Sequence, residues 1–371
     1  MKYLRWLLFP FSLLYGLVVI VRNWLYDAGI FRSQKFNLPV ISVGNLEVGG
    51  AGKSPMTEYL IRLLKDNYKL ATLSRGYGRK TKGFISIKYQ VPSIKTREAE
   101  THNSPLATQI GDEPAQFKRK FPDITVAVDE NRVEGIKKLL PDHELILMDD
   151  AYQHRAVEPG LSILLFDYGK LNQSPLLLPA GNMREPFSGR WRAQIIVISK
   201  CPQQLTLSEQ ALIAEKIKPL PYQQLFFTSI GYQLLQDMEG RPTDTVIDKD
   251  TTIFLLTGIA NAEPLVQYLS SRTPHIIHHN YPDHHPFTLK NITKLAAEYS
   301  ACESQKKVII TTEKDAQRLE ESWFNPGLST ADQVPVFVIP IRVEFLNGTG
   351  DRFDQLITEY VREHTAHNGI H

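Results

Sequence analysis

The sequence predicts an α/β fold with a parallel sheet, a second and smaller α/β lobe, and an apolar N-terminal helix. Three observations support this prediction. Short apolar runs alternate with amphipathic stretches along most of the chain, as is typical of a parallel sheet covered by helices. A glycine-rich turn follows the first run, and an uncharged segment precedes it. With 371 residues, the chain is long enough for two lobes of ordinary size.

Composition and charge exclude several classes of protein. Apolar residues make up 42% of the chain and charged residues 22%, values that are typical of a folded globular protein. The net charge of +2 does not indicate a nucleic-acid partner, and no obligatory protein partner is inferred. Cys201 and Cys302 stand far apart, so the sequence predicts neither a disulfide framework nor a zinc site. A reducing cytoplasm is therefore expected.

Residues 1–31 are expected to associate with a membrane. The run from Trp6 to Val21 carries no charge, and Trp24 and Tyr26 suit a membrane interface. At 1.5 Å per residue the run reaches about 24 Å, less than the hydrocarbon core of about 30 Å, and Pro10 is expected to disturb a helix. Shallow insertion is therefore the favoured interpretation. The alternative is a helix buried against the protein's own core.

Two α/β lobes are expected after this segment. The first, at residues 32–234, would be the nucleotide-binding domain, and the second, at residues 235–371, would be a smaller C-terminal lobe. Apolar runs predict strands at 38–43, 70–73, 124–128, 145–148, 162–166, 195–198 and 226–234, and then at 253–256, 275–278, 308–311 and 336–339. Helical patterns cover residues 55–66 and 351–363.

The strongest single motif is a glycine-rich turn between a predicted strand and a predicted helix. Its residues are Gly49, Gly50, Ala51, Gly52, Lys53 and Ser54. Glycines let backbone N–H groups surround a polyphosphate, Lys53 can reach the terminal phosphates, and Ser54 can ligate magnesium. Glu47 stands where a strict pattern has glycine. The turn predicts a P-loop NTPase-like domain, and the alternative is a flexible turn without a ligand.

Two aspartates follow the predicted strand at 145–148. Asp149 and Asp150 occupy the place of the magnesium carboxylate in P-loop enzymes, and their pairing with Lys53 favours metal binding. Alone, two aspartates after a strand are more often a turn or a helix cap. Gln153 and His154 follow within one turn and can touch the same phosphates, and a structural polar contact is the alternative.

Other polar clusters can act on an acceptor. Asp112 and Glu113 precede a proline at a predicted helix start, and His284 and His285 follow an aspartate in the second lobe. An Asp oriented by a His suits removal of a hydroxyl proton, but acidic residues also cap helices routinely. For the two histidines, a solvated turn or a metal pair remains open.

Arginines near turn glycines suggest anion clamps. Arg75 lies in SRGYG, and Arg184 precedes Glu185 in LPAGNMREP. The guanidinium fork suits phosphate groups, although each arginine alone is more often a structural residue.

Eight motifs occur in one order along the chain: VGNLEVGGAGKSP, SRGYG, GDEP, DDAYQH, LPAGNMREP, LTGIANAEP, PDHHPF and TTEKDAQRL. Together they resemble the tetraacyldisaccharide 4'-kinase family of the lipid A pathway. The resemblance covers most of the chain beyond Val43. It implies ATP with Mg²⁺, transfer of the γ-phosphoryl group to the 4'-hydroxyl of a lipid disaccharide, and a peripheral or monotopic position at the cytoplasmic face of the bacterial inner membrane.

The resemblance also implies residue roles. Asp112 would be the catalytic base and His284 its partner, because the family pattern retains the first histidine after the aspartate. The two residues lie in different predicted lobes, so closure of the lobes is expected. By role, the other expected site residues are Ser54, Asp149, Asp150 and Glu185 for magnesium, Gln153 and His154 for the nucleotide, and Arg75, Glu113, Arg132 and Arg184 for the acceptor.

The chain departs from the family pattern at two positions. Ala151 replaces a glycine and Ser54 replaces the commoner threonine. Serine keeps the hydroxyl, and alanine adds one methyl group near the nucleotide. A second hypothesis is a membrane-tethered P-loop NTPase switch that acts on a protein partner, and a third is a non-catalytic nucleotide-binding module.

Overall fold

A computed structural model describes residues 2–88, 106–283, 285–319 and 336–368. The chain forms two compact units: Met1–Gly231 together with Arg342–His371, and Tyr232–Ile341. Residues 342–371 therefore belong to the first unit, and their assignment to the C-terminal lobe was wrong. The reason is the helix α10 (Gly350–Asn368), whose apolar side chains are buried in the core of the first unit.

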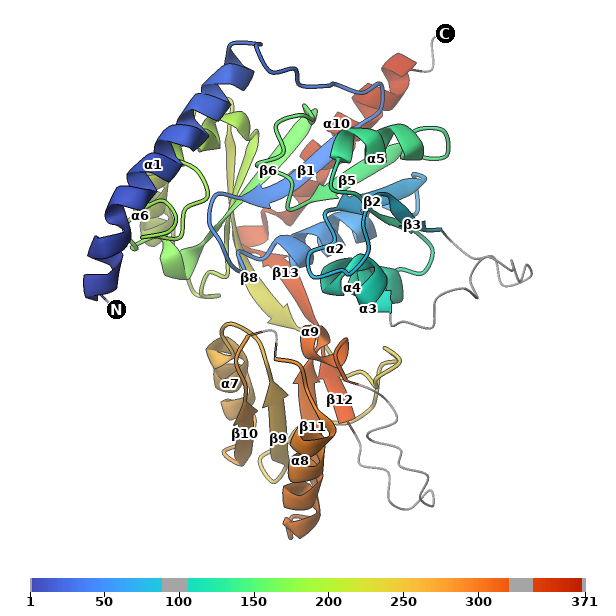
Figure 1. The fold of residues 1–371 in the computed structure, drawn as a ribbon. Helices are drawn as coiled ribbons and strands as arrows, with labels where there is room; N and C mark the ends of the chain where they lie inside the picture. The colour runs from blue at the N-terminus through green and yellow to red at the C-terminus, as the bar shows by residue number, and fades with distance from the viewer. Residues whose placement is uncertain (1, 89–105, 284, 320–335, 369–371) are drawn as a thin grey trace. The chain divides into compact units, whose positions relative to one another are not determined.

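A nine-stranded sheet organises the first unit, in the order β13-β8-β7-β6-β1-β5-β2-β4-β3 (Figure 1). The pairings from β8 across to β4 are parallel, and β3 pairs antiparallel with β4. The strands are β1 (Val40–Asn45), β2 (Leu70–Ser74), β3 (Ile85–Ile87), β4 (Thr125–Val128), β5 (Leu145–Asp149), β6 (Leu161–Asp167), β7 (Ile195–Ser199), β8 (Gln224–Tyr232) and β13 (Ile341–Phe345).

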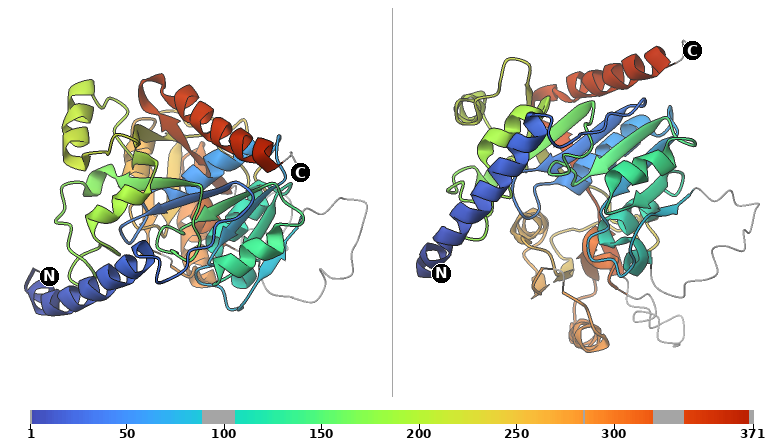
Figure 2. Two further views of the ribbon diagram at one scale, coloured as in Figure 1. Left: turned by 90° about the horizontal axis from the view of Figure 1, so that it is seen from above. Right: turned by 45° about the horizontal axis from the view of Figure 1, so that its top comes forward.

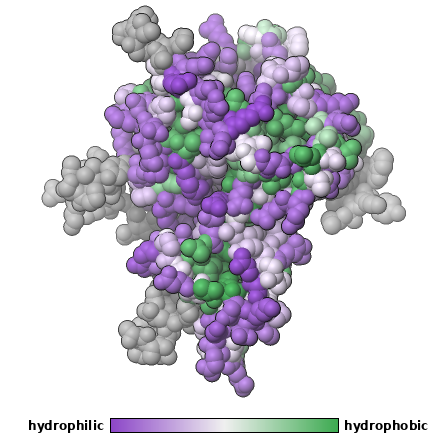
Figure 3. Space-filling view, turned by 180° about the vertical axis from the view of Figure 1, so that it is seen from behind, coloured by the Kyte–Doolittle hydropathy of each residue, from purple (hydrophilic) through white to green (hydrophobic). Residues whose placement is uncertain are grey.

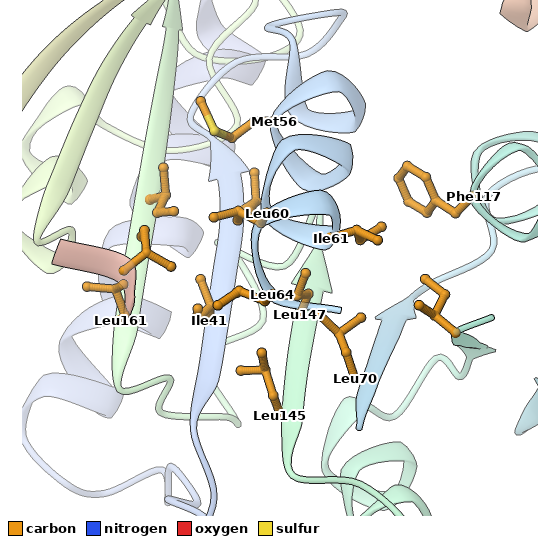
Figure 4. Close-up of a cluster of buried hydrophobic side chains, with 14 of the residues drawn as sticks. Ile41, Met56, Leu60, Ile61, Leu64, Leu70, Phe117, Leu145, Leu147 and Leu161 are labelled. Atoms are coloured by element: carbon orange, nitrogen blue, oxygen red, sulfur yellow. The ribbon is translucent and has the colours of Figure 1, made fainter. Parts of the chain in front are cut away.

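Helices cover both faces of this sheet. One face buries apolar side chains of α2 (Lys53–Leu64), α4 (Asp112–Lys120) and α10, and Figure 4 shows Leu60 and Leu64 of α2 beside Ile41 of β1. The other face packs against α5 (Arg132–Leu139) and α6 (Leu207–Ile217). The short α3 (Leu106–Ile110) precedes α4. This double covering explains why the central strands β1, β5 and β6 are buried along their whole length.

The carboxyl ends of the parallel strands are polar. Asn45, Ser74, Asp149, Asp167 and Ser199 are the last residues of β1, β2, β5, β6 and β7. Parallel strands bring these ends to one edge of the sheet, where ligands of open α/β sheets bind. A functional site of the first unit is therefore expected at this edge.

The second unit is a smaller parallel sheet, in the order β10-β9-β11-β12. Its elements are β9 (Thr252–Thr257), α7 (Glu263–Ser270), β10 (Ile276–Asn280), α8 (Leu289–Ala301), β11 (Lys307–Thr312), α9 (Glu313–Ala316) and β12 (Val336–Ile339). Leu265 of α7 and Leu295 of α8 pack into separate apolar clusters on this sheet. The predicted fold class, with two α/β units and an apolar N-terminal helix, is confirmed.

The N-terminal helix α1 (Lys2–Asp27) docks through a polar edge. Ser12, Gly16 and Val19 are buried, at the spacing of one helix face. The apolar side chains instead point outward: Leu14 and Leu17 are about 60% exposed. Figure 2 shows α1 along the flank of the first unit. In Figure 3, which is seen from behind, hydrophobic residues gather on the right of the first unit, the side on which α1 lies in that view. The alternative of a helix buried in the protein's own core is therefore wrong.

Helix α1 also continues through Pro10, which the sequence prediction expected to disturb it. Proline removes one main-chain hydrogen bond, and the bonds on both sides hold the helix together. By length and composition, Leu7–Asp27 is sufficient to cross a membrane.

The placement of α10 in the first unit generates a prediction. Phe353 is fully buried against Phe226 of β8 and Tyr59 of α2. Phe353→Ala should therefore destabilise the first unit by about 3–5 kcal/mol. Hydrogen exchange should speed up in α2 and β8 and stay unchanged in β9 and β11. Gln355→Ala, an exposed change on the same helix, is the control, and faster exchange confined to the second unit would contradict the assignment.

Candidate active site

The phosphate loop connects the central strand β1 to α2. Gly49 and Gly52 have φ angles of 98° and 81°, a region that residues with a side chain rarely adopt. Lys53 begins α2 and is almost completely buried. Its Nζ lies 3.3 Å from Asn45 Oδ1 and 3.6 Å from Asp150 Oδ1. The loop thus holds its lysine at the carboxyl end of β1.

The backbone pairing around Glu47 explains why the loop does not need a glycine at this position. Glu47 forms an isolated bridge with Met183, Val48 N donates to Asn182 O at 2.8 Å, and Arg184 N donates to Leu46 O at 2.7 Å. The first part of the loop is therefore paired as extended chain and needs no positive φ. Glycine is required only where the loop turns.

Three residues that the sequence reasoning missed hold the loop's carbonyl groups. Lys170 Nζ donates to Val48 O at 3.1 Å, Lys200 Nζ donates to Gly50 O, and Ser199 Oγ donates to Ala51 O at 2.8 Å. These hydrogen bonds restrain the loop at three of its carbonyl groups. Lys170 and Lys200 follow the ends of β6 and β7, and a polar residue just beyond a parallel strand is the signal that identifies such positions.

Carboxylates and hydroxyls gather beside the lysine. Thr57 Oγ1 donates to Asp149 Oδ1 at 3.0 Å, and Ser54 Oγ donates to Glu113 Oε1 at 2.7 Å. Burial raises the pKa of Asp149, and the nearby carboxylates of Glu113 and Asp150 act in the same direction. Glu113, which was expected to contact the acceptor, therefore lies beside the Ser54 hydroxyl group, which was expected to bind magnesium.

Asp150 bridges the lysine to a second motif. Its φ of 46° lies in the left-handed region, which aspartate tolerates better than most residues. Besides Lys53, its carboxylate contacts Arg184 Nη1 at 2.8 Å. Burial opposes its ionisation, but the Lys53 and Arg184 charges outweigh burial and lower the pKa of Asp150. Arg184, expected at the acceptor, thus binds an aspartate of the phosphate-binding region.

The donor set fits magnesium. Ser54, Glu113 and Asp149 supply hard oxygen atoms. Burial is the main cause of the raised pKa of Asp149, and the carboxylates of Glu113 and Asp150 add to it, so a cation at this place would offset negative charge. Within the described part of the chain, no group of three or more His, Cys, Asp or Glu side chains could by itself hold a metal ion. Mg²⁺ commonly uses one or two carboxylates together with substrate phosphates and water, so the two observations agree.

Glu185, expected as a metal ligand, has a different environment. It is fully buried, and Oε1 accepts from Gln153 Nε2 at 2.9 Å. Oε2 accepts from Arg192 Nη2 at 2.6 Å and from Asn23 Nδ2 at 3.2 Å. Because protein donors occupy both oxygens, the structure favours a positioning role for Glu185 over metal binding.

Gln153 and His154, both expected at the nucleotide, are placed differently. Gln153 Nε2 also donates to Asn45 O at 2.8 Å, so it braces the end of β1. His154 faces arginines: burial lowers its pKa to about 4, and Arg132, Arg22 and Arg75 add to the effect. Its imidazole is therefore neutral at physiological pH.

The expected acceptor residues begin α4. Gly111 precedes Asp112, and a Cβ on Gly111 would lie 2.6 Å from Tyr77 O, so the SRGYG turn closely contacts this helix start. His284 lies outside the described residues. His285 stacks on Tyr281, with ring centroids 4.5 Å apart, and its Nε2 lies 3.3 Å from Asn291 Oδ1, which gives it a structural role in the second unit.

The buried Glu185 pair generates a prediction. Glu185→Gln would leave Arg192 without its counter-charge and should lower the free energy of unfolding by about 3–5 kcal/mol. Urea unfolding measures this loss. Asp142→Asn, which breaks the exposed pair with Lys88, should match the unchanged protein. A stable Glu185→Gln variant with a weakened Mg²⁺ requirement would instead support the metal-ligand role.

Comparisons with known proteins show which family the chain resembles. Residues 4–362 match the model of the family described as Tetraacyldisaccharide-1-P 4'-kinase. A tetraacyldisaccharide 4'-kinase of Bacteroides thetaiotaomicron is 42% identical, over 99% of this chain and 95% of the relative. One of Flavobacterium johnsoniae is also 42% identical, over 98% and 99%.

A solved structure is also similar. It is the "apo" form of LpxK from Aquifex aeolicus in complex with ATP, with a TM-score of 0.70 and 28% identity over 96% of this chain and 99% of that chain. The resemblance drawn from the eight ordered motifs is confirmed, and the chain belongs to the tetraacyldisaccharide 4'-kinase family.

Proposed function

We propose that this kinase transfers the γ-phosphoryl group of ATP to the 4'-hydroxyl of a tetraacyldisaccharide 1-phosphate. The observation that carries this proposal is the convergence of Lys53, Asp149 and Asp150 at the carboxyl end of β1. Lys53 would bind the terminal phosphates of ATP. Because it is buried beside Asp150, its ammonium group is already oriented before the nucleotide binds.

Ser54 and Asp149 would hold Mg²⁺, which would neutralise charge on the transferred phosphoryl group. Asp149 is the better candidate of the two aspartates, because it lies beside Glu113 and the Ser54 hydroxyl, whereas Asp150 pairs with cations. Asp150 would then keep Lys53 and Arg184 in place.

Asp112 would take the proton from the attacking hydroxyl, with His284 as its partner. Its place at the start of α4, next to Glu113, supports this role because Glu113 contacts the phosphate-loop serine. The carboxylate would therefore approach the acceptor close to the transferred group. Arg75 and Arg132 would bind the phosphate that the acceptor carries.

Helix α1 would bring the enzyme to its lipid substrate at the cytoplasmic face of the inner membrane. Its docked edge is hydrogen-bonded to the protein: Ser12 Oγ donates to Leu177 O at 3.0 Å and Tyr15 OH donates to Arg184 O at 2.8 Å. A helix held this way presents one apolar face, so we favour a monotopic helix lying in the interface.

The decisive experiment supplies purified protein and Mg-ATP with tetraacyldisaccharide 1-phosphate in detergent micelles. The kinase proposal expects a phosphorylated lipid and ATP consumption that depends on the acceptor. A membrane-tethered switch would hydrolyse ATP without acceptor, so free hydrolysis with unphosphorylated lipid would reject the proposal.

Two variants separate nucleotide binding from proton removal. Lys53→Ala should abolish turnover and strongly weaken ATP binding, because it removes the buried charge at the phosphates. Asp112→Asn should lower kcat by about 10²–10⁴-fold and leave ATP affinity unchanged. Binding of a fluorescent ATP analogue gives the affinity. Nearly full turnover in Asp112→Asn would rule out the base.

The exposed face of α1 is tested by a double substitution. Leu14→Gln with Leu17→Gln removes apolar area that would enter the membrane, so binding to vesicles should fall at least about tenfold in flotation. Leu212→Gln, the same chemical change at an exposed position of α6, is the control. Equal flotation of both proteins would contradict the membrane role.

A further inference from the structure

A row of polar contacts joins α2, the helix of the phosphate loop, to α4, the helix that begins with Asp112. The α2 side of the row repeats about once per turn, so it lies on one helix face: Ser54, Glu58, Arg62 and Lys65. Their partners follow in the same order: Glu113, then Gln116 and Lys120, then Phe121, and last Asp123. The two helices therefore run in the same direction and keep one register.

Glu58 is the buried centre of this row. Its side chain is only 2% exposed. Oε1 accepts from Gln116 Nε2 at 2.8 Å, and Oε2 accepts from Lys120 Nζ and, at 3.2 Å, from Arg62 Nη2. A carboxylate that has lost its water needs such partners. Because two of the three belong to α4, the charge of Glu58 holds α4 against α2.

The polar character of this contact indicates a role other than stability. Apolar side chains of similar volume in place of a buried ion pair are often equally stabilising or more so. Phe117 of α4 and Ile61 of α2 already pack in one apolar cluster. Apolar surfaces can slide against each other, whereas a carboxylate with three directed partners fits only the arrangement in which those partners reach it. Glu58 therefore fixes the register of the two helices.

The register of α4 decides where its first residues lie. Asp112 and Glu113 begin the helix, and Gln116 follows Asp112 by about one turn. Glu113 Oε1 accepts from the hydroxyl of Ser54 at 2.7 Å, so the start of α4 lies against the phosphate loop. A base must be within hydrogen-bond reach of the proton that it removes, and a misplacement of about 1 Å can cost about 10²-fold in rate.

We propose that Glu58 is a positioning residue for phosphoryl transfer: through Gln116 and Lys120 it holds α4, and with it Asp112, in a fixed place beside the phosphate loop. The inference rests on the proposed function, because it takes Asp112 as the base. Glu58 acts through α4 and not on the reacting atoms. Its loss should therefore slow the transfer step and leave the binding of Mg-ATP at Lys53 unchanged.

The test measures steady-state kinetics of full-length Glu58→Leu with Mg-ATP and tetraacyldisaccharide 1-phosphate in micelles. Leucine fills the space and removes the directed contacts, so kcat should fall about 10–100-fold, while KM for Mg-ATP should change less than about threefold. Glu58→Gln is the conservative variant. Its amide group still bonds both partners on α4 when Gln116 turns its own amide, so most of kcat should return. Circular dichroism checks that each variant is folded at the assay temperature.

Lys120→Met removes the same link from the α4 side. It should also lower kcat. The double variant with Glu58→Leu should be no slower than Glu58→Leu alone, because the second change removes a contact that is already lost. If the two losses instead multiply, the residues act independently and the inference is overturned.

Tyr59→Phe is the matched control on α2. The hydroxyl of Tyr59 donates to Asp354 Oδ1 at 2.7 Å, so it joins α2 to α10 instead of α4. Its loss should lower the melting temperature and leave kcat unchanged. A Glu58→Leu variant with the same behaviour would overturn the inference, because Glu58 would then only stabilise the fold.

The remaining outcomes separate this inference from the proposed function. If the unchanged protein does not phosphorylate the lipid, the kinase proposal fails and the inference fails with it. If the unchanged protein is active, Asp112→Asn is not, and Glu58→Leu keeps its full kcat, the inference alone fails. Weakened ATP binding in Glu58→Leu would also overturn it, because Glu58 would then support the phosphate loop.

Discussion

The buried charge of Lys53 is the constraint on which the site depends. An ammonium group so far from water requires an opposite charge, and Asp150 supplies it at 3.6 Å. Asp150 reaches this place through a left-handed backbone conformation directly after β5. Its carboxylate then fixes Arg184, whose main chain pairs with the start of the phosphate loop. One charge requirement thus links three separated motifs.

A second buried charge ties the N-terminal helix to the same region. Glu185 is neutralised by Arg192 and also accepts from Asn23 of α1 and from Gln153. Tyr15 of α1 donates to the carbonyl of the neighbouring Arg184. Helix α1 is therefore hydrogen-bonded to Arg184 and Glu185, which contact Asp150 and Gln153 beside the phosphate loop. A change in the docking of α1 would therefore alter the position of these residues.

The side chains of α1 are distributed unequally between the side that faces the protein and the side that faces outward. Ser12 and Tyr15 are hydrogen-bonded to the protein and the leucines face outward, the reverse of a helix on the surface of a soluble protein. The arrangement suits an enzyme whose substrate remains in a lipid layer. Under the proposed function, the lipid acceptor would not have to leave the membrane completely to reach the active site.

The sequence alone determined the fold class, the phosphate loop and the family, because these depend on local patterns: apolar periodicity, glycines at turns, and ordered motifs. Tertiary structure decided what local patterns do not contain. Residues 342–371 belong to the first unit, where Phe353 is buried. Glu185 accepts hydrogen bonds from Arg192 and Asn23, which only the folded chain brings together. His154 lies among arginines from three distant segments. Such roles depend on which charges share a buried space, and only the folded chain brings them together.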